Sequence, residues 1–304
     1  MKFIPQPLHY CLLLVSLLQI GCSQQTLMNT IVKSSKYLDG CIEGNCENGK
    51  GTLVFEDKKR KMQYMGEFRN GKFNGQGALI LQDIKGKNQR KVEYDGQFKD
   101  NLSFGYGIKT TSQKTNGSWK STVTECNSWV KWKANGEGNR ILPNGSRYEG
   151  HFENDKFSGQ GTMIYKCGNK YTGEWKSGKR HSRGMMIYHD GSQYSGEWKN
   201  GKQHGQGTMN FSSGDVYTGE WKEHKRTGEG TYIWGEGNYK DDKYIGQFKN
   251  NIRVGQGTMH YANGDTYVGG WKNGKRHGKG KLTRSDGTGQ TGKWVNGVFS
   301  DTDH

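Results

Sequence analysis

Proline and long apolar runs are both scarce in this sequence. Only 3 of its 304 residues are proline, and the longest uncharged, largely apolar run is Cys11–Ile20. A transmembrane helix takes about 20 apolar residues, so this run is too short to cross a bilayer as a helix. The scarcity of proline excludes collagen-like sequence and proline-rich linkers.

The residue patterns typical of enzymes are also missing. The six cysteines include no Cys-x2-Cys pair, the spacing expected of a zinc site. A Gly-x4-Gly-Lys match to a phosphate-binding loop begins at Gly196, but Gln203 stands where a magnesium-binding Ser or Thr is needed. His181, His204 and His277 share one repeat position and are expected about 10 Å apart, too far to share a metal. We therefore predict a non-enzymatic chain with no catalytic residue, no cofactor and no metal.

Charge is abundant and unbalanced. The chain has 45 Lys and Arg against 29 Asp and Glu, a formal net charge of +16. A low apolar fraction with many charges is typical of disorder, but the 12% of aromatic residues are periodic and can bury a large area each. This combination predicts a thin fold that is mostly surface. The positive charge indicates either simple solubility or attraction to an anionic surface.

Glycine and aromatic residues recur at a fixed period. The segment YSGEWKNGKQHGQGTMNFSSGDV opens at Tyr194, and the pattern begins again 23 residues later at Tyr217. A constant period of this size is typical of a repeat array. Longer steps predict loops before Tyr94, before Glu125 (the TTSQKTNGSWKSTVT segment) and at 237–241. The eleven units start at Leu38, Tyr64, Tyr94, Glu125, Tyr148, Tyr171, Tyr194, Tyr217, Tyr244, Tyr267 and Gln290.

Each unit reads as one β-hairpin. Tyr194, Gly196 and Trp198 alternate with polar residues, which predicts a strand with one aromatic face. Asn-Gly at 200–201 predicts a tight turn, and paired glycines in the second strand leave bare backbone on which the neighbouring rings can lie. The turn requires positive φ at Gly201 and its equivalents. These are Gly71, Asn101, Asp155, Gly178, His224, Asn251, Gly274 and Gly297.

The pattern Tyr-x-Gly-x-Trp followed by Gly-Lys-x-His-Gly-x-Gly resembles the MORN-repeat family. The resemblance covers residues 38–297 and implies an all-β fold, an elongated single-layer antiparallel sheet of stacked hairpins. The two outer units and the Glu125 unit are degenerate, and residues 298–304 form a tail. Departures from the pattern include Ser182 for Gly, Thr227 for His, and Asn127 for the first Gly of the Glu125 unit.

The N-terminus reads as an export signal at residues 1–21, followed by a linker at 22–37. Gly21-Cys22 resembles a bacterial lipobox, although Gln19 stands where leucine is expected, so Cys22 is the candidate lipidation site. Ordinary secretion and an uncleaved anchor are the alternatives. We predict an exported chain on a bacterial membrane, periplasmic or at the cell surface, or else secreted. In an oxidising compartment Cys41 and Cys46 could form a local disulfide.

Three functions fit the array, and none of them involves nucleic acid. The first is a scaffold that binds an unidentified partner protein, as a helix or peptide, along an aromatic groove; the others are binding of anionic lipid by a basic turn edge and a passive envelope component. The predicted partner surface comprises Tyr148, Tyr171, Trp175, Tyr194, Trp198, Tyr217, Trp221, Tyr244, Tyr267 and Trp271. The predicted lipid-binding residues are Lys179, Arg180, Lys202, Lys225, Arg226, Lys275 and Arg276.

Overall fold

The computed structural model describes residues 40–86 and 88–300. The export signal at 1–21, the linker and Cys22 lie outside these residues. The described part of the chain is built of β-strands and has no α-helix. It divides into two compact units, Met1–Lys133 and Ala134–His304, and within each of them every strand is antiparallel. The predicted all-β architecture of stacked hairpins is therefore confirmed.

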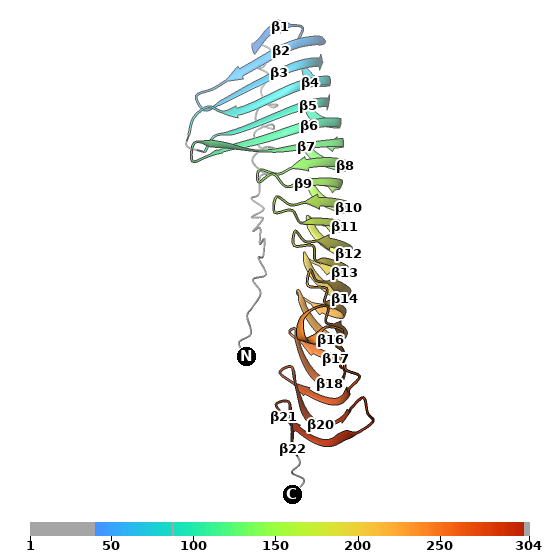
Figure 1. The fold of residues 1–304 in the computed structure, drawn as a ribbon. Coiled ribbons are helices and arrows are strands. Elements are labelled where there is room, and N and C mark those ends of the chain that lie inside the picture. The colour runs from blue at the N-terminus through green and yellow to red at the C-terminus, as the bar shows by residue number, and fades with distance from the viewer. Residues whose placement is uncertain (1–39, 87, 301–304) are drawn as a thin grey trace. The chain divides into compact units, whose positions relative to one another are not determined.

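Unit 1 is a meander in which each strand pairs with the next one along the chain (Figure 1). The extra residues of its repeats were predicted to be loops. Before Glu125 this was wrong, and before Tyr94 it is correct in part, since one strand ends at Asp83 and the next begins at Arg90. The other extra residues lengthen the strands, because β-branched residues such as Thr110, Thr111 and Thr115 favour extended backbone. The strands are β1 (Cys41–Gly44), β2 (Gly49–Glu56), β3 (Arg60–Arg69), β4 (Lys72–Asp83), β5 (Arg90–Lys99), β6 (Leu102–Thr115) and β7 (Ser118–Val130).

A disulfide closes the first hairpin of unit 1. Cys41 and Cys46 are bonded across the β1–β2 turn, five residues apart in sequence. The partly exposed Cys41 lies on the first strand, whereas Cys46 is buried. The bond thus fixes the hairpin at the end of the described part of the unit, where residues 40–133 provide no further strand beside β1.

Unit 2 continues the same hairpin pattern with shorter strands. The predicted loop at 237–241 is confirmed, since Gly237–Tyr239 form a 3₁₀ turn, η2, rather than strand. The last strand includes Val298–Ser300, so the array extends three residues beyond its predicted end. The strands are β8 (Lys133–Ile141), β9 (Arg147–Glu153), β10 (Lys156–Ile164), β11 (Lys170–Lys176), β12 (Lys179–Ile187), β13 (Gln193–Lys199), β14 (Lys202–Asn210), β15 (Val216–Lys222), β16 (Lys225–Ile233), β17 (Lys243–Lys249), β18 (Ile252–His260), β19 (Thr266–Lys272), β20 (Lys275–Thr283), β21 (Gly289–Val295) and β22 (Val298–Ser300).

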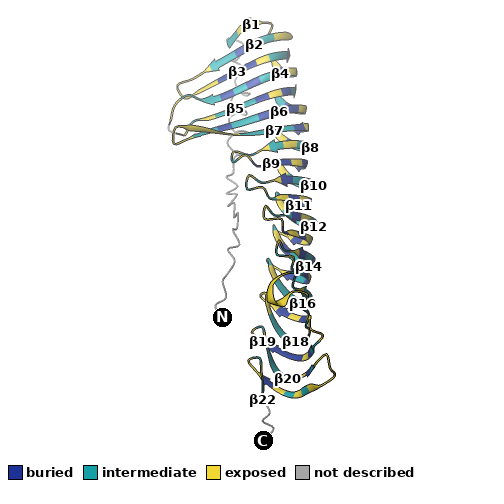
Figure 2. Ribbon diagram, viewed as in Figure 1, coloured by how far each residue is buried: buried dark blue, intermediate teal, exposed yellow. Residues whose placement is uncertain are grey.

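The core consists of tyrosine rings lying on glycine backbone, as predicted. Tyr194 is fully buried, and a Cβ built on Gly207 of the next strand would be 2.4 Å from its hydroxyl oxygen. The same hydroxyl donates to the carbonyl of Glu197 at 2.9 Å, and Trp198 Nε1 donates to Gly184 O at 3.0 Å. Buried bands recur on successive strands in Figure 2. We call the face that carries these rings the inner face and the opposite one the outer face.

The turn residues behave as expected. All eight equivalents of Gly201 have positive φ, from 66° at Asn101 to 95° at Gly297. His224 is among them, with φ 69°. One turn residue was missed: Trp132 also has positive φ, 70°, and its backbone N–H donates to Ser103 Oγ at 2.6 Å.

The register predicted for the Glu125 unit was wrong by one residue. Cys126 lies opposite Gly107, the position that the first glycine takes in other repeats, and Thr124 therefore takes the place of the tyrosine. Trp129 keeps its usual bond, Nε1 to Gly107 O at 2.7 Å. The extra residue before it is absorbed by a break in the β6–β7 register. Lys109 packs over the Trp129 ring, 4.6 Å from its centroid, in the space that a smaller side chain at 124 leaves.

Candidate functional site

The ten rings predicted to form the partner-binding surface are buried. Tyr148, Tyr171, Tyr194, Tyr217, Tyr244 and Tyr267 are at most 1% exposed, and Trp175, Trp198, Trp221 and Trp271 at most 6%. Burial raises the pKa of these tyrosines, so the phenols remain neutral hydrogen-bond donors. The prediction needs correction: these residues form the core of the sheet and are not exposed to a partner.

A second aromatic column remains half-exposed on the inner face. It occupies the position just after each second strand, two residues beyond the buried Met163 in the first case. Side chains two apart in an extended chain share a face, which places this column beside the core rings. The sequence already showed it as a 23-residue recurrence of large aromatics. We call these residues the inner aromatic strip: Tyr165, Tyr188, Phe211, Trp234 and Tyr261.

Arginines line the strip on the side of the hairpin turns. The Arg253 guanidinium carbon lies 4.6 Å from the Trp271 ring centroid and 5.2 Å from that of Trp234, so it joins a core ring to a strip ring. Its Nη2 donates to the carbonyl of Gly274, in the next turn, at 2.9 Å. Arg180, Arg226 and Arg276 make the equivalent bonds to Gly201, Asn251 and Gly297.

The Tyr148 and Tyr194 repeats lack this arginine and have Phe157 and Gln203 at its position. Gln203 is 5% exposed, and its Nε2 donates to the hydroxyl of Tyr188 at 3.2 Å. His224, from the following turn, fills the remaining space with Nδ1 3.3 Å from Gln203 Oε1. Burial, and then the nearby charges of Arg180 and Lys202, lower the pKa of His224 to about 4. His224 is therefore a neutral side chain of the inner face at neutral pH.

The seven residues predicted to bind anionic lipid separate into two groups. Lys179, Lys202, Lys225 and Lys275 are exposed at the hairpin turns. The arginines at 180, 226 and 276 are half-buried and engaged with rings and carbonyls. These arginines stabilise the fold, because their guanidinium N–H groups are directed to backbone carbonyls rather than to solvent. Only the lysines form an open basic edge.

The outer face has a shallow groove of about 630 Å³ across β10–β15. Its floor is glycine backbone with Ser195 and Thr208, and its sides are longer polar residues such as Arg183. Glu197 is already engaged there, since its Oε1 accepts from Gln206 N at 3.0 Å. The groove offers hydrogen-bonding groups on a flat support, without enclosing a ligand.

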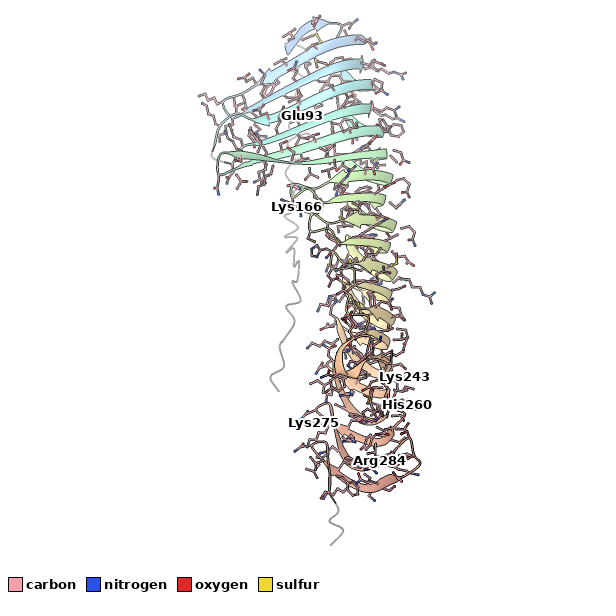
Figure 3. The ribbon with its side chains drawn as sticks, viewed as in Figure 1. Glu93, Lys166, Lys243, His260, Lys275 and Arg284 are labelled. Atoms are coloured by element: carbon pink, nitrogen blue, oxygen red, sulfur yellow. A yellow bond between two sulfur atoms is a disulfide. The ribbon has the colours of Figure 1, made fainter. Side chains whose placement is uncertain are left out.

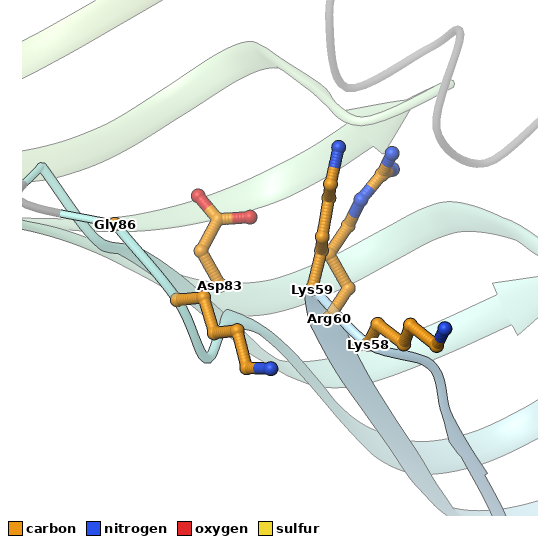
Figure 4. Close-up of a pocket in the computed structure, with 6 residues that line it drawn as sticks. Lys58, Lys59, Arg60, Asp83 and Gly86 are labelled. Carbon is orange, nitrogen blue, oxygen red and sulfur yellow. The ribbon is translucent and has the colours of Figure 1, made fainter.

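A basic hollow of about 470 Å³ lies at one edge of unit 1 (Figure 4). Lys58 and Lys59 come from the β2–β3 turn, Arg60 begins β3, and Lys85 comes from the loop after β4, with the carboxylate of Asp83 among them. All four cations are exposed. The hollow is therefore best described as a solvated basic turn.

Residues 40–86 and 88–300 contain no group of three or more His, Cys, Asp and Glu placed to hold a metal ion. Cys126 Sγ donates to Ser128 O at 3.4 Å, and the Cys167 thiol is half-buried. Across the same residues, no helix has the length and apolar character needed to span a membrane.

A family model described as MORN repeat matches eight segments that together make up more than half of the chain. The three units that it leaves unmatched begin at Leu38, Glu125 and Gln290, the ones predicted to be degenerate. Comparison with curated proteins finds no match. The matched residues are 64–83, 94–113, 148–170, 171–193, 194–216, 217–239, 244–266 and 267–289. With its glycine-supported tyrosine core and its repeated hairpins, the chain belongs to the MORN repeat family.

Proposed function

We propose that the chain is an exported, membrane-tethered scaffold that binds an amphipathic helix of a partner protein along the inner aromatic strip. MORN repeat proteins are generally non-catalytic scaffolds, which is the family-level basis of the proposal. The single observation that carries it is the row of half-exposed aromatic side chains beside an already complete core. Such rings supply large contact area at low entropic cost.

The spacing of the strip suits a helix. Equivalent residues of neighbouring repeats are two strands apart, about 10 Å. Two turns of an α-helix rise about 11 Å, so apolar residues seven apart on a helix would meet successive strip rings.

Export is supported by the disulfide. Structural disulfides persist mainly in oxidising compartments, and Cys41 and Cys46 are bonded at the first hairpin. Tethering through a lipid on Cys22 is tested by mass spectrometry of the mature N-terminus. A diacylglyceryl Cys22 is expected, and an unmodified N-terminus at another residue would contradict it.

The binding function is tested with variants that the fold tolerates. Arg284 occupies the strip position in the repeat that begins at Tyr267, so Tyr188→Arg with Tyr261→Arg should fold. The matched control is Met185→Arg with Ile245→Arg, which adds the same charge at residues 40% and 41% exposed on the outer face. Proteins that co-purify from the source cell envelope with wild type and control should be lost from the strip variant.

Two results would count against this function. Equal recovery of partners by both variants would exclude the strip as the binding surface. If neither wild type nor control recovers a protein that the strip variant loses, the passive envelope component becomes the better account.

A further inference from the structure

Lysines face one another across the hairpin turns of unit 2. In the β11–β12 hairpin Lys176 lies directly opposite Lys179. Three other hairpins repeat the arrangement, and in the β17–β18 hairpin Lys249 lies opposite Ile252. All of these lysines are exposed. We call the set the lysine ladder: Lys176, Lys179, Lys199, Lys202, Lys222, Lys225, Lys249, Lys272 and Lys275.

The ladder runs along one edge of the sheet. Figure 3 labels Lys275, which begins β20 at the turn edge, and Lys243, which begins β17 at the opposite edge. Successive lysine pairs are two strands apart, about 10 Å, so the ladder from β11 to β20 extends for roughly 40 Å. It is a narrow line of positive charge rather than a broad patch.

Nearby acidic groups leave most of this charge uncompensated. Within the part of the chain that the structure describes, one ladder lysine is in an ion pair, Lys202 Nζ with Glu223 Oε2 at 3.5 Å. Glu197 and Glu220, two residues before their ladder lysines, are turned toward backbone amides. Glu174 is the third carboxylate at this repeat position. Like charges directly opposite on paired strands are destabilising, so the repeated pairs are better explained by binding than by folding.

The turn tips between the lysines indicate what kind of anion fits. A surface that inserts into a bilayer carries apolar side chains next to its cations, and one that binds single-stranded nucleic acid carries aromatics for base stacking. The five tips carry no apolar side chain, and their one aromatic ring, His224, packs against Gln203 on the inner face. Ile252, 45% exposed, is the one apolar residue at the ladder positions. The tips consist of Ser177, Gly178, Asn200, Gly201, Glu223, His224, Asn250, Asn251, Asn273 and Gly274.

We propose that the lysine ladder binds a linear polyanion without bases, a chain with phosphate or carboxylate groups along its length. Lysine suits this role because its ammonium is a point charge with no fixed geometry. The site lies on the turn edge, apart from the inner aromatic strip, so it does not depend on the proposed partner function. An exported scaffold could in this way hold an anionic polymer and a protein at once.

The test measures binding of fluorescent inorganic polyphosphate to the full chain at fixed salt. The variant Lys199→Gln, Lys222→Gln, Lys249→Gln, Lys272→Gln removes four ladder charges. At roughly fivefold per lysine beside an anionic surface, the affinity should fall by at least about 50-fold. The matched control neutralises four exposed lysines away from the ladder, Lys166, Lys170, Lys279 and Lys281, and should change the affinity less than about threefold.

Alginate, a carboxylate polymer, serves as a second probe. Comparison with polyphosphate shows whether the ladder prefers phosphate or carboxylate groups. Tighter binding of polyphosphate assigns a phosphate chain, and tighter binding of alginate a carboxylate chain. Equal weakening by the ladder variant and its control would overturn the proposal, because the attraction would then reflect net charge alone. Tighter binding to vesicles of anionic lipid, or to single-stranded DNA, than to both polymers would overturn it as well.

Discussion

The hydroxyl of Tyr194 occupies the space that a side chain on Gly207 would need, since a Cβ there would lie 2.4 Å from it and 2.6 Å from ring carbon Cζ. Gly207→Ala should therefore destabilise the chain by about 1–3 kcal/mol, the usual effect of overpacking. Urea denaturation followed by tryptophan fluorescence measures it.

A double-mutant cycle with Tyr194→Leu isolates this contact. The leucine removes the ring that opposes the new methyl group, so Gly207→Ala should be less harmful in that background than in the wild type. Additive effects would mean that the glycine is needed for a reason other than the ring above it.

Ser182 offers a test in the stabilising direction. It holds a position that is glycine in most repeats, and its φ is 51°. Ser182→Gly should raise the unfolding free energy by about 1 kcal/mol, because only glycine adopts this conformation without strain. The reciprocal control, Gly205→Ser, should destabilise, because Gly205 has φ 57°, which a serine adopts only with strain. If the Ser182→Gly protein is less stable than the wild type, the backbone at Ser182 is not strained.

His224 should make stability depend on pH. Its folded pKa of about 4 lies below the unfolded value of 6.5, so the unfolded chain binds more protons between these values. The stability is fully present above pH 6.5 and is lost as pH falls toward 4. Asparagine also tolerates positive φ, but it does not titrate. His224→Asn should therefore reduce the loss of unfolding free energy as pH falls. Urea denaturation at pH 7 and pH 5 measures it, and an unchanged pH dependence would exclude His224 as its source.

Substitution of Arg253 should destabilise the fold much more than substitution of Lys275, although both residues carry one positive charge. Arg253→Lys removes the planar contact with Trp271 and the bond to Gly274 O, and we expect a loss of about 1–2 kcal/mol. Lys275→Gln, at an exposed position, should change stability by less than about 0.5 kcal/mol. Similar losses in the two variants would show that the arginine is no more structural than the lysine.

The sequence predicted the hairpins, the turn column and the tyrosine-on-glycine packing, because each of them repeats and depends on neighbours in the pattern. It did not predict which rings are covered. Tyr194 and Tyr188 are both aromatic and recur at the same period, and only the folded backbone shows that one is fully buried and the other half-exposed.

The burial of the basic residues and the register of the long repeats could not be predicted from the sequence either. Arg180 and Lys179 are adjacent basic residues, but alternation along the strand turns the arginine toward the inner rings and leaves the lysine exposed. In the Glu125 unit one inserted residue displaced the register, and without a tyrosine no sequence signal marked the true start at Thr124.

Site-specific photocrosslinking in the source cell tests the partner-binding claim most directly. A benzophenone amino acid replaces Tyr188 on the inner aromatic strip or, as a control, Met185 on the outer face, and crosslinked peptides are mapped by mass spectrometry. The account predicts an adduct at 188, absent at 185, with an amphipathic helical segment that carries apolar residues seven apart. Crosslinks at 185 but not at 188, or at neither position, would contradict it.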